Sequence, residues 1–244
     1  MKGIILAGGT GSRLYPITKV TNKHLLPVGR YPMIYHSVYK LKECNIEDII
    51  VITGKEHMGD VVNFLGSGME FGVSITYRVQ EKAGGIAQAL GLCEAFVGND
   101  KMVVILGDNV FSDALKPYVE KYKKEKKGAK ILLKEVDNPQ RFGVPEIKGE
   151  HIIAIEEKPK VPKSSYAVTG IYMYDSHVFQ YVKDLRPSAR GELEITDLNN
   201  AYIKEGTLTY DIFEGWWTDA GTHSSLYHAN TLAKDIRLRE EEDA

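Results

Sequence analysis

The first half of the chain alternates between continuous apolar runs and segments whose apolar residues recur every three or four positions. The continuous runs predict buried strands at residues 2–7, 48–53, 73–79 and 102–106. The periodic segments predict helices at residues 32–41, 60–65 and 86–96, the first opening on Pro32. This alternation is typical of an α/β protein with a mostly parallel, Rossmann-like central sheet flanked by helices.

The second half has shorter predicted strands connected by turns. They lie at residues 131–136, 143–147, 152–155, 168–174 and 208–213. We expect them to form antiparallel additions to one edge or face of the sheet. Further helices are predicted at residues 193–203 and 226–238, a solvated helix face at 120–127 and a frayed acidic run at 240–243. No linker or repeat divides the sequence, so we expect one domain over residues 1–244.

A glycine-rich loop with nearby cations follows the first predicted strand. Glycine lets backbone N–H groups approach a phosphate chain closely, and a cation neutralises the phosphate charge. The sequence therefore predicts a nucleotide-phosphate site, although the glycines alone also fit a strand-to-helix turn that binds no ligand. The residues of this site are Gly8, Gly9, Gly11, Ser12, Arg13 and Lys23.

Neither of the two common phosphate-binding motifs fits this loop. A dinucleotide fingerprint requires G-x-G-x-x-G, and Leu14 stands where the third glycine would be. A P-loop requires G-x-x-x-x-G-K-[ST], and the pair Gly54–Lys55 lacks both the upstream glycine and the following hydroxyl residue. The missing fingerprint argues against a dinucleotide-dependent oxidoreductase.

Three polar or glycine-rich segments each begin where a predicted strand ends. Gly8, Gln80 and Asp108 follow the apolar runs 4–7, 75–79 and 103–107. Ligands of open α/β sheets bind beyond the carboxyl ends of the strands. We therefore expect the phosphate loop, an amide and a carboxylate to line one crevice.

The opening loop resembles the signature of the sugar-1-phosphate nucleotidyltransferases, and the resemblance continues in order through nearly the whole chain. Further matching stretches are 80–89 (QEKAGGIAQA), 106–109 (LGDN), 142–144 (FGV), 156–159 (EEKP), 167–172 (AVTGIY), 190–197 (RGELEITD) and 217–221 (WTDAG). One such motif would be weak, but the ordered set is specific. It looks most like the thymidylyltransferase branch of the family.

The resemblance implies a reaction in which dTTP and α-D-glucose 1-phosphate give dTDP-glucose and pyrophosphate, for dTDP-sugar biosynthesis of the rhamnose type. The same reaction with UTP or another sugar 1-phosphate remains open, as does a non-catalytic nucleotide-sugar sensor on this fold. The chain departs from relatives in two places. His24 stands where many have Gln, and Glu81–Ala83 replaces a Pro-rich spacing.

Two aspartates are candidate ligands of Mg²⁺. Asp108 follows an apolar strand, and Asp219 lies in a turn rich in aromatic residues and glycine. Carboxylate oxygens suit Mg²⁺, whose remaining ligands are waters and phosphates. Either aspartate alone also fits a turn or helix N-cap. The resemblance assigns the metal to both positions, and it assigns base recognition to Gln80 and Gly85.

The resemblance also implies a sugar-phosphate pocket. Glu157 would accept hydrogen bonds from sugar hydroxyls, and Lys158 would bind the phosphate as a point charge. Because Pro159 restricts the preceding residue, we expect Lys158 to be extended. The further expected contacts of the sugar phosphate are Asn109, Gly143, Val168, Tyr172 and Arg190.

The expected mechanism needs no general base. A sugar phosphate has a second pKa of about 6, so it is largely dianionic at neutral pH and can attack the α-phosphorus in line. Catalysis then consists of positioning and charge neutralisation. Arg13 would stabilise the leaving pyrophosphate, while Lys23 and Lys158 would hold the attacking phosphate. Mg²⁺ held by Asp108 and Asp219 would assist the displacement.

The overall composition of the chain excludes some classes of binding partner. The net charge of −2 argues against nucleic acid, because the chain has no basic excess. No apolar run approaches the ~20 residues of a membrane span, and the first is too short for a signal peptide. Cys44 and Cys93 form no disulfide framework, so we expect reduced thiols in a cytoplasmic protein.

The resemblance carries one expectation about regulation. Longer thymidylyltransferases have extra C-terminal helices that build subunit contacts and a second nucleotide-sugar pocket, whereas this sequence ends at Ala244. We expect an end product to compete mainly at the active site, and any homo-oligomer to be smaller or looser than in those relatives.

Overall fold

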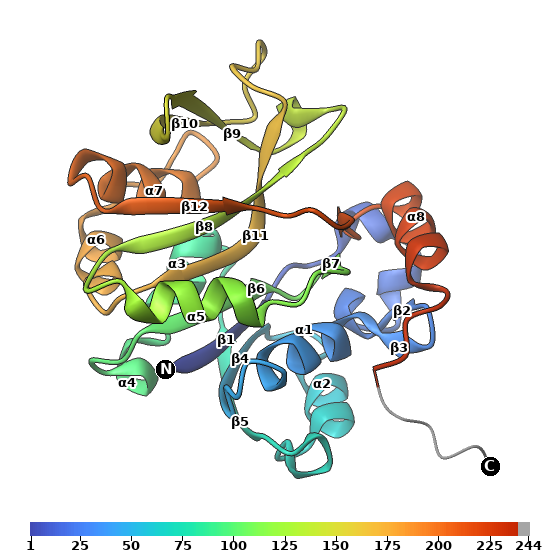
Figure 1. The fold of residues 1–244 in the computed structure, drawn as a ribbon. Helices are drawn as coiled ribbons and strands as arrows, with labels where there is room; N and C mark the ends of the chain where they lie inside the picture. The colour runs from blue at the N-terminus through green and yellow to red at the C-terminus, as the bar shows by residue number, and fades with distance from the viewer. Residues whose placement is uncertain (239–244) are drawn as a thin grey trace.

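The core of the protein is a seven-stranded sheet (Figure 1). A computed structural model describes residues 1–238. The strand order is β12-β8-β11-β6-β1-β4-β5. In chain order these strands are β1 (Lys2–Ala7), β4 (Asp48–Gly54), β5 (Ser74–Gln80), β6 (Met102–Leu106), β8 (Ala129–Glu135), β11 (Tyr166–Tyr174) and β12 (Leu208–Ile212).

The strand directions confirm a mostly parallel sheet with antiparallel additions. β1 pairs in parallel with β4 and β6, and β4 pairs in parallel with β5. β11 is antiparallel to both β6 and β8. β12 is parallel to β8, so the expectation of an antiparallel strand at 208–213 is wrong. Three small antiparallel pairs complete the strands: β2 (Pro27–Val28) with β3 (Tyr31–Pro32), β7 (Asn109–Phe111) with β13 (Trp217–Asp219), and β9 (Gly143–Lys148) with β10 (His151–Glu157).

Helices cover both faces of the sheet. One core contains Ile5, Val51 and Ile105 and packs against α1 (Met33–Lys42), α2 (Met58–Leu65) and α5 (Lys116–Lys124). The other contains Ile4, Ile52 and Val104 and packs against α3 (Ile86–Gly91), α4 (Glu94–Val97), α6 (Val178–Asp184) and α7 (Ile195–Lys204). Because alternate residues of the central strands face opposite cores, β1 from Gly3 and β6 throughout are apolar, whereas the edge strands β5 and β12 carry polar residues.

The remaining helices are α8 and a set of short 3₁₀ turns. α8 spans His223–Ala233. The turns are η1 (Ser12–Leu14), η2 (Ile17–Lys19), η3 (Lys23–Leu25), η4 (Met69–Phe71) and η5 (Pro139–Arg141).

Two predicted helices differ from the structure. The helix predicted over 86–96 is broken into α3 and α4. Gly91 ends α3, and a Cβ there would lie 2.9 Å from Cγ1 of Val182 on α6, so the glycine both weakens the helix and admits the neighbouring helix. The helix predicted over 226–238 instead begins at His223, because Thr222 and Ser225 form a capping box.

The C-terminal helix ends at a different residue from the one that the sequence predicts. α8 ends at Ala233, earlier than predicted. The acidic run 240–243 lies outside the described residues, and the single-domain prediction over 1–244 stays a prediction.

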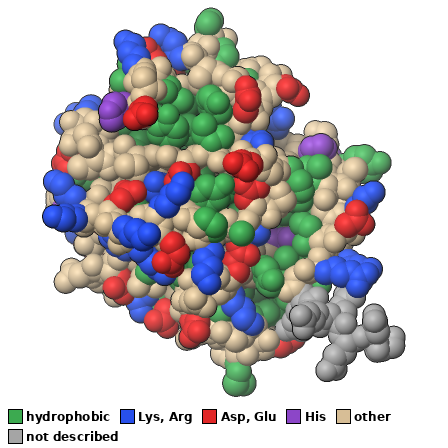
Figure 2. Space-filling model, in the orientation of Figure 1, with side chains coloured by type: hydrophobic (Ala, Val, Ile, Leu, Met, Phe, Trp, Pro, Cys, Tyr) green, Lys and Arg blue, Asp and Glu red, His purple; other side chains and the backbone are tan. Residues whose placement is uncertain are grey.

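Both cysteines are buried and unbridged. Burial raises the pKa of each thiol to about 12, so these thiols are unreactive at neutral pH. Within the described residues, no helix combines the length and apolar character needed to cross a membrane. Lysines and arginines are interspersed with acidic side chains on the face drawn in Figure 2.

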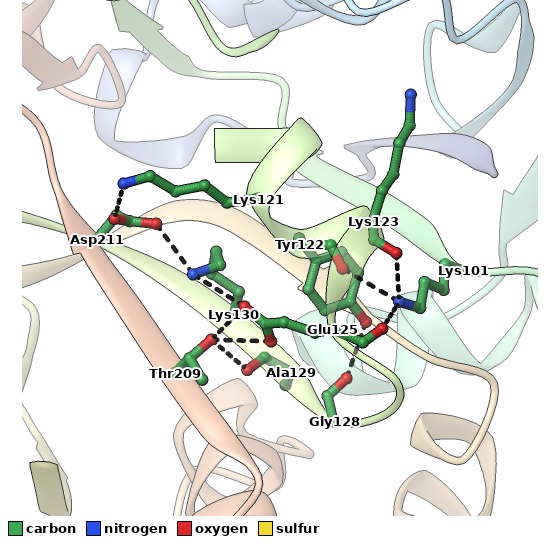
Figure 3. A network of polar contacts seen from close by, with 10 residues as sticks. All are labelled: Lys101, Lys121, Tyr122, Lys123, Glu125, Gly128, Ala129, Lys130, Thr209 and Asp211. Atoms are coloured by element: carbon green, nitrogen blue, oxygen red, sulfur yellow. Dashed lines mark hydrogen bonds and ion pairs between the residues drawn. The ribbon is translucent and has the colours of Figure 1, made fainter. Parts of the chain in front are cut away.

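A polar network fastens α5 and β12 to the sheet (Figure 3). Lys101 Nζ donates to the carbonyl oxygens of Tyr122 (3.1 Å) and Lys123 (3.4 Å), which satisfies the C-terminal end of α5. Buried Lys130 lies 2.9 Å from an Asp211 carboxylate oxygen and 3.1 Å from a Glu125 oxygen. The run 120–127 is therefore exposed at its lysines, but buried Tyr122 and half-buried Glu125 tie it to the sheet.

We expect Lys130→Met to destabilise the fold by about 2–3 kcal/mol, because it removes the buried ammonium shared by Glu125 and Asp211 and leaves Asp211 only its pair with exposed Lys121. Lys121→Met is the matched control. Its ammonium lies 2.7 Å from Asp211, but its side chain is 61% exposed, so a loss below about 1 kcal/mol is expected. Urea unfolding at pH 7 measures both variants, and equal losses would contradict the assignment.

The same network predicts a pH dependence. Burial alone would raise the pKa of Asp211, but hydrogen bonds from Lys121 and Lys130 outweigh it and hold that pKa below its usual value. A lowered carboxyl pKa stabilises the fold above the unfolded pKa, and this stabilisation is lost as the pH falls below about 4. The difference between wild type and Lys130→Met should therefore shrink between pH 7 and pH 3.

Candidate active site

A cavity of about 370 Å³ opens at the carboxyl ends of β1, β5 and β6. This is the edge at which the sequence predicted a crevice, and segments from the whole chain contribute to the wall. Most predicted site residues line it: Gly8, Gly9, Arg13, Lys23, Gln80, Gly85, Asp108, Asn109, Gly143, Glu157, Lys158, Val168, Tyr172 and Asp219.

Three predicted site residues do not line the cavity. Gly11 precedes η1 with a φ of +67°, a left-handed conformation that favours glycine, and its carbonyl oxygen accepts a hydrogen bond from Thr18. Ser12 is the first residue of that turn. Arg190 pairs with both carboxylate oxygens of Glu194, at 3.0 and 2.9 Å, and its Nη2 also lies 3.8 Å from Oε1 of the cavity residue Glu157. The ligand contacts predicted for these three stay predictions.

Strand pairing brings the two candidate metal ligands together. In the β7–β13 ladder, Asp219 lies opposite Asn109, and the N–H of Ala220 donates to the carbonyl oxygen of Asp108 at 2.9 Å. A Cβ on Gly221 would lie 2.7 Å from Asp219 Oδ1, 3.5 Å from Asp108 Oδ2 and 3.0 Å from Arg13 Nη2. The two carboxylates and the guanidinium therefore surround one point.

The charges of this pair are not balanced. Burial would raise the pKa of Asp108, but Lys23, whose ammonium contacts Asp108 Oδ2, holds it well below its usual value. Burial and the charge of Asp108 together raise the pKa of Asp219. A further cation beside Asp219 would stabilise its ionised form and lower its pKa.

The donor set fits a hard divalent cation. The site offers carboxylate oxygens from two residues, which suits an ion that keeps waters and phosphate oxygens in its shell. Among residues 1–238, no group of three or more His, Cys, Asp or Glu side chains forms a metal cluster. A metal at this site would therefore depend on substrate oxygens for the rest of its ligands.

His24 is a cavity residue that the sequence flagged only as a departure from relatives. Asn22 Oδ1 accepts from the backbone N–H of His24 at 2.9 Å and lies 2.7 Å from its Nδ1, so the ring carries its proton on Nδ1. Burial, followed by the charge of Lys23, lowers the pKa of His24 to about 3. The ring is therefore neutral at physiological pH.

On the far wall, a turn directs Lys158 and Glu157 toward the cavity. Lys158 has a φ of +48°, so the prediction of an extended residue before Pro159 is wrong. Its N–H donates to the carbonyl oxygen of Phe142 at 2.9 Å, a contact that overrides the local preference. Glu157 accepts a hydrogen bond of 2.7 Å from Thr196 and lies 3.4 Å from the Lys158 ammonium.

Asn109 holds other parts of the site in position. Its Oδ1 accepts from the Gly170 N–H at 2.9 Å and from the Trp217 indole at 2.7 Å. Its Nδ2 donates to Asp108 Oδ1 at 3.1 Å. The side chain is buried, so its main visible role is to fix Asp108 and the β13 turn.

Several cavity residues were not singled out from the sequence as site residues. Phe142 and Trp217 stack edge to face and lie inside matching stretches, so the motifs carried a signal for them. Arg141 stands next to one such stretch. Except for Leu6 and His24, the others also lie inside matching stretches, although no role was assigned to their side chains; the full set is Leu6, His24, Ala83, Ile86, Ala89, Leu106, Arg141, Phe142, Gly170, Glu192, Ile195 and Trp217.

Comparison with known proteins identifies the family. The nucleotidyl transferase family model matches residues 2–235. A glucose-1-phosphate thymidylyltransferase of Neisseria meningitidis is 45% identical over 241 residues, which cover 97% of this chain and 84% of that protein. One of Xanthomonas campestris is 43% identical over 244 residues, covering 98% and 82%. This chain therefore belongs to the nucleotidyl transferase family of enzymes.

Solved structures agree with this assignment. A Bacillus anthracis protein provisionally named a glucose-1-phosphate thymidylyltransferase, in complex with a sucrose, is 76% identical. It superposes with a TM-score of 0.94, and the match covers 97% of this chain and 96% of that one. A UDP-glucose pyrophosphorylase complexed with UDP-glucose, 24% identical with a TM-score of 0.84 over 97% and 99% of the two chains, shares the fold.

We expect the buried neutral His24 to make the fold sensitive to mild acid. His24 binds a proton near pH 6.5 in the unfolded chain and only near pH 3 in the folded chain. The free energy of unfolding therefore decreases by about 1.4 kcal/mol for each unit by which the pH falls between these values. His24→Gln should lose about 2 kcal/mol less stability than wild type between pH 7 and pH 5 in urea unfolding. His228→Gln, at an exposed position, is the control, and an unchanged slope in His24→Gln would contradict the assignment.

Proposed function

We propose that this enzyme transfers a thymidylyl group from dTTP to α-D-glucose 1-phosphate, giving dTDP-glucose and pyrophosphate for dTDP-sugar biosynthesis. The observation that carries the proposal is one cavity lined by the glycine loop, the Asp108–Asp219 pair and the Glu157–Lys158 turn. The similarity to relatives named glucose-1-phosphate thymidylyltransferase supports the choice of substrates. The two unbridged cysteines support a cytoplasmic setting for this reaction.

We propose Mg²⁺ as the metal, held by Asp108 and Asp219. When bound, it would neutralise phosphate charge and act as a Lewis acid. The raised pKa of Asp219 supports this choice, because a buried carboxylate beside another favours a bound cation.

In the proposed mechanism the protein positions two phosphates and neutralises their charge. A sugar-phosphate oxygen attacks the α-phosphorus of dTTP in line, and the bond to pyrophosphate breaks. The attacking phosphate is already largely dianionic at neutral pH, so no side chain needs to remove a proton. Lys158 and Lys23 offset the repulsion between the two phosphates, and Arg13 binds the charge that develops on pyrophosphate.

Nucleotide preference is the central test. Pyrophosphate release is measured with dTTP, UTP, dCTP and dATP, each with glucose 1-phosphate and other sugar phosphates. We expect dTTP to be preferred over UTP by roughly fourfold, because burial of the thymine methyl contributes about 0.8 kcal/mol. A UTP efficiency equal to or above that of dTTP would refute the thymidylyl assignment, and no turnover of any pair would favour a nucleotide-sugar sensor.

Activity should depend on a divalent metal. Excess EDTA should abolish pyrophosphate release, and added Mg²⁺ should restore it. We expect Asp108→Asn and Asp219→Asn each to lower kcat/KM by about 10²- to 10³-fold, because each removes one of the two carboxylates that would hold the metal at the phosphates. Asp137→Asn, at an exposed position, should keep wild-type kinetics. Full activity in excess chelator would rule out the proposed metal.

Arg13, beside the two aspartates, and Lys158, beside Glu157, should have separable kinetic effects. Lys158→Ala should raise the KM for glucose 1-phosphate about tenfold with little change in kcat, because it removes ground-state binding of the phosphate. Arg13→Ala should lower kcat about 10²-fold, because its interaction grows as charge develops on pyrophosphate. Exposed Lys160→Ala is the control. The reverse pattern would overturn these assignments.

A further inference from the structure

The amide of Gln80 is fixed from its nitrogen end. Its Nε2 donates to the carbonyl oxygen of Gly85 at 3.2 Å and to Gln88 Oε1 at 2.6 Å. A backbone carbonyl can only accept, so the contact with Gly85 sets which end of the Gln80 amide is nitrogen. A primary amide has two N–H donors, and both are engaged within the protein.

The carbonyl end of the same amide is directed at the glycine loop. A Cβ on Gly8 would lie only 2.4 Å from Gln80 Oε1, so glycine at this position leaves room for that oxygen. Gln80 and Gly8 both line the cavity. Among the residues that the structure describes, no donor hydrogen-bonds to Gln80 Oε1. The group left for a ligand is therefore an acceptor.

Gln88 helps to fix the orientation of the Gln80 amide, although it does not line the cavity. It lies in α3, half-buried, and its side-chain amide covers Gly84, where a Cβ would be 2.7 Å from Gln88 Cδ. Gly84 in turn accepts a hydrogen bond of 2.8 Å from the N–H of Leu193. The Gln88 amide is thus held between Gln80 and a loop that is itself anchored.

We propose that Gln88 is a positioning residue that sets base specificity, since it engages the nitrogen of Gln80 and leaves Oε1 to accept a hydrogen bond from the base. This inference rests on the proposed function. The N3 position of thymine and uracil is an N–H donor, which suits Oε1. The N3 of cytosine is an acceptor, and two acceptors facing one another repel. The site therefore accepts thymine and uracil and rejects cytosine.

The test compares dTTP with dCTP in variants of Gln88. Steady-state kcat/KM is measured by pyrophosphate release, and equilibrium binding of each nucleotide is measured by calorimetry. Gln88→Glu keeps an acceptor oxygen and should keep the wild-type ratio of dTTP to dCTP. Gln88→Met removes one of the two acceptors that hold Nε2 and leaves only the Gly85 carbonyl, so the amide is held less firmly and that ratio should fall by about threefold to tenfold.

A third variant places a hydrogen-bond donor at position 88 in place of the acceptor. Gln88→Lys replaces the acceptor with a donor that attracts Gln80 Oε1. The ammonium then competes with the Gly85 carbonyl for the orientation of the amide, so a larger share of the enzyme should present Nε2 to the base. The ratio of dTTP to dCTP should then fall further than in Gln88→Met. In both variants the change should appear in the KM for the nucleotide, while the KM for glucose 1-phosphate stays within about twofold of wild type.

Controls separate positioning from folding and from the proposed function. Gln180→Met and Gln180→Lys make the same changes at an exposed site on α6 and should leave the ratio unchanged. An unchanged ratio in Gln88→Met and Gln88→Lys, with activity lost equally for both nucleotides, would overturn the inference. Wild-type enzyme that turns over neither dTTP nor UTP refutes the proposed function, and calorimetry then decides the inference, because equal binding of dTTP and dCTP overturns it.

Discussion

Two partly buried carboxylates, Asp108 and Asp219, lie together in the cavity, and holding them there is the constraint on which the rest of the site depends. Burial raises the pKa of Asp219, and the charge of Asp108 raises it further. The β7–β13 ladder nevertheless fixes their separation, and Lys23 and Arg13 lie beside them as cations. The site is therefore prepared for a further cation and for phosphate oxygens, which convert an unfavourable pair into a binding site.

The position of the two carboxylates is maintained by hydrogen bonds some distance from the cavity. Lys40 on α1 donates to the carbonyl oxygen of Asp113 at 2.7 Å. The Asp113 carboxylate accepts from the N–H groups of Glu214 at 3.0 Å and Gly215 at 2.7 Å, just before β13. A helix on one face of the sheet thus helps to hold the segment that carries Asp219.

The part of the cavity around Gln80 and the part around Glu157, which we propose to bind the base and the sugar, are joined by one segment, residues 193–196. Leu193 donates to Gly84 at 2.8 Å and accepts from the N–H of Ala87 at 3.2 Å, which anchors the loop after Gln80. Three residues later, Thr196 donates to the Glu157 carboxylate at 2.7 Å. Both ends of a bound nucleotide sugar would therefore contact parts of the protein that pack against the same short stretch.

The sequence by itself determined the parallel sheet and the edge at which the site lies, because strands buried on both faces must be apolar throughout and parallel strands end together. Only the tertiary structure decided the rest. The break at Gly91 depends on Val182, the left-handed Lys158 on the carbonyl of Phe142, and the position of the Arg190 guanidinium on Glu194. Likewise, the acceptor face of Gln80 depends on Gln88 and Gly85. Near neighbours set local propensity, whereas these conformations are set by partners whose positions depend on how the chain folds.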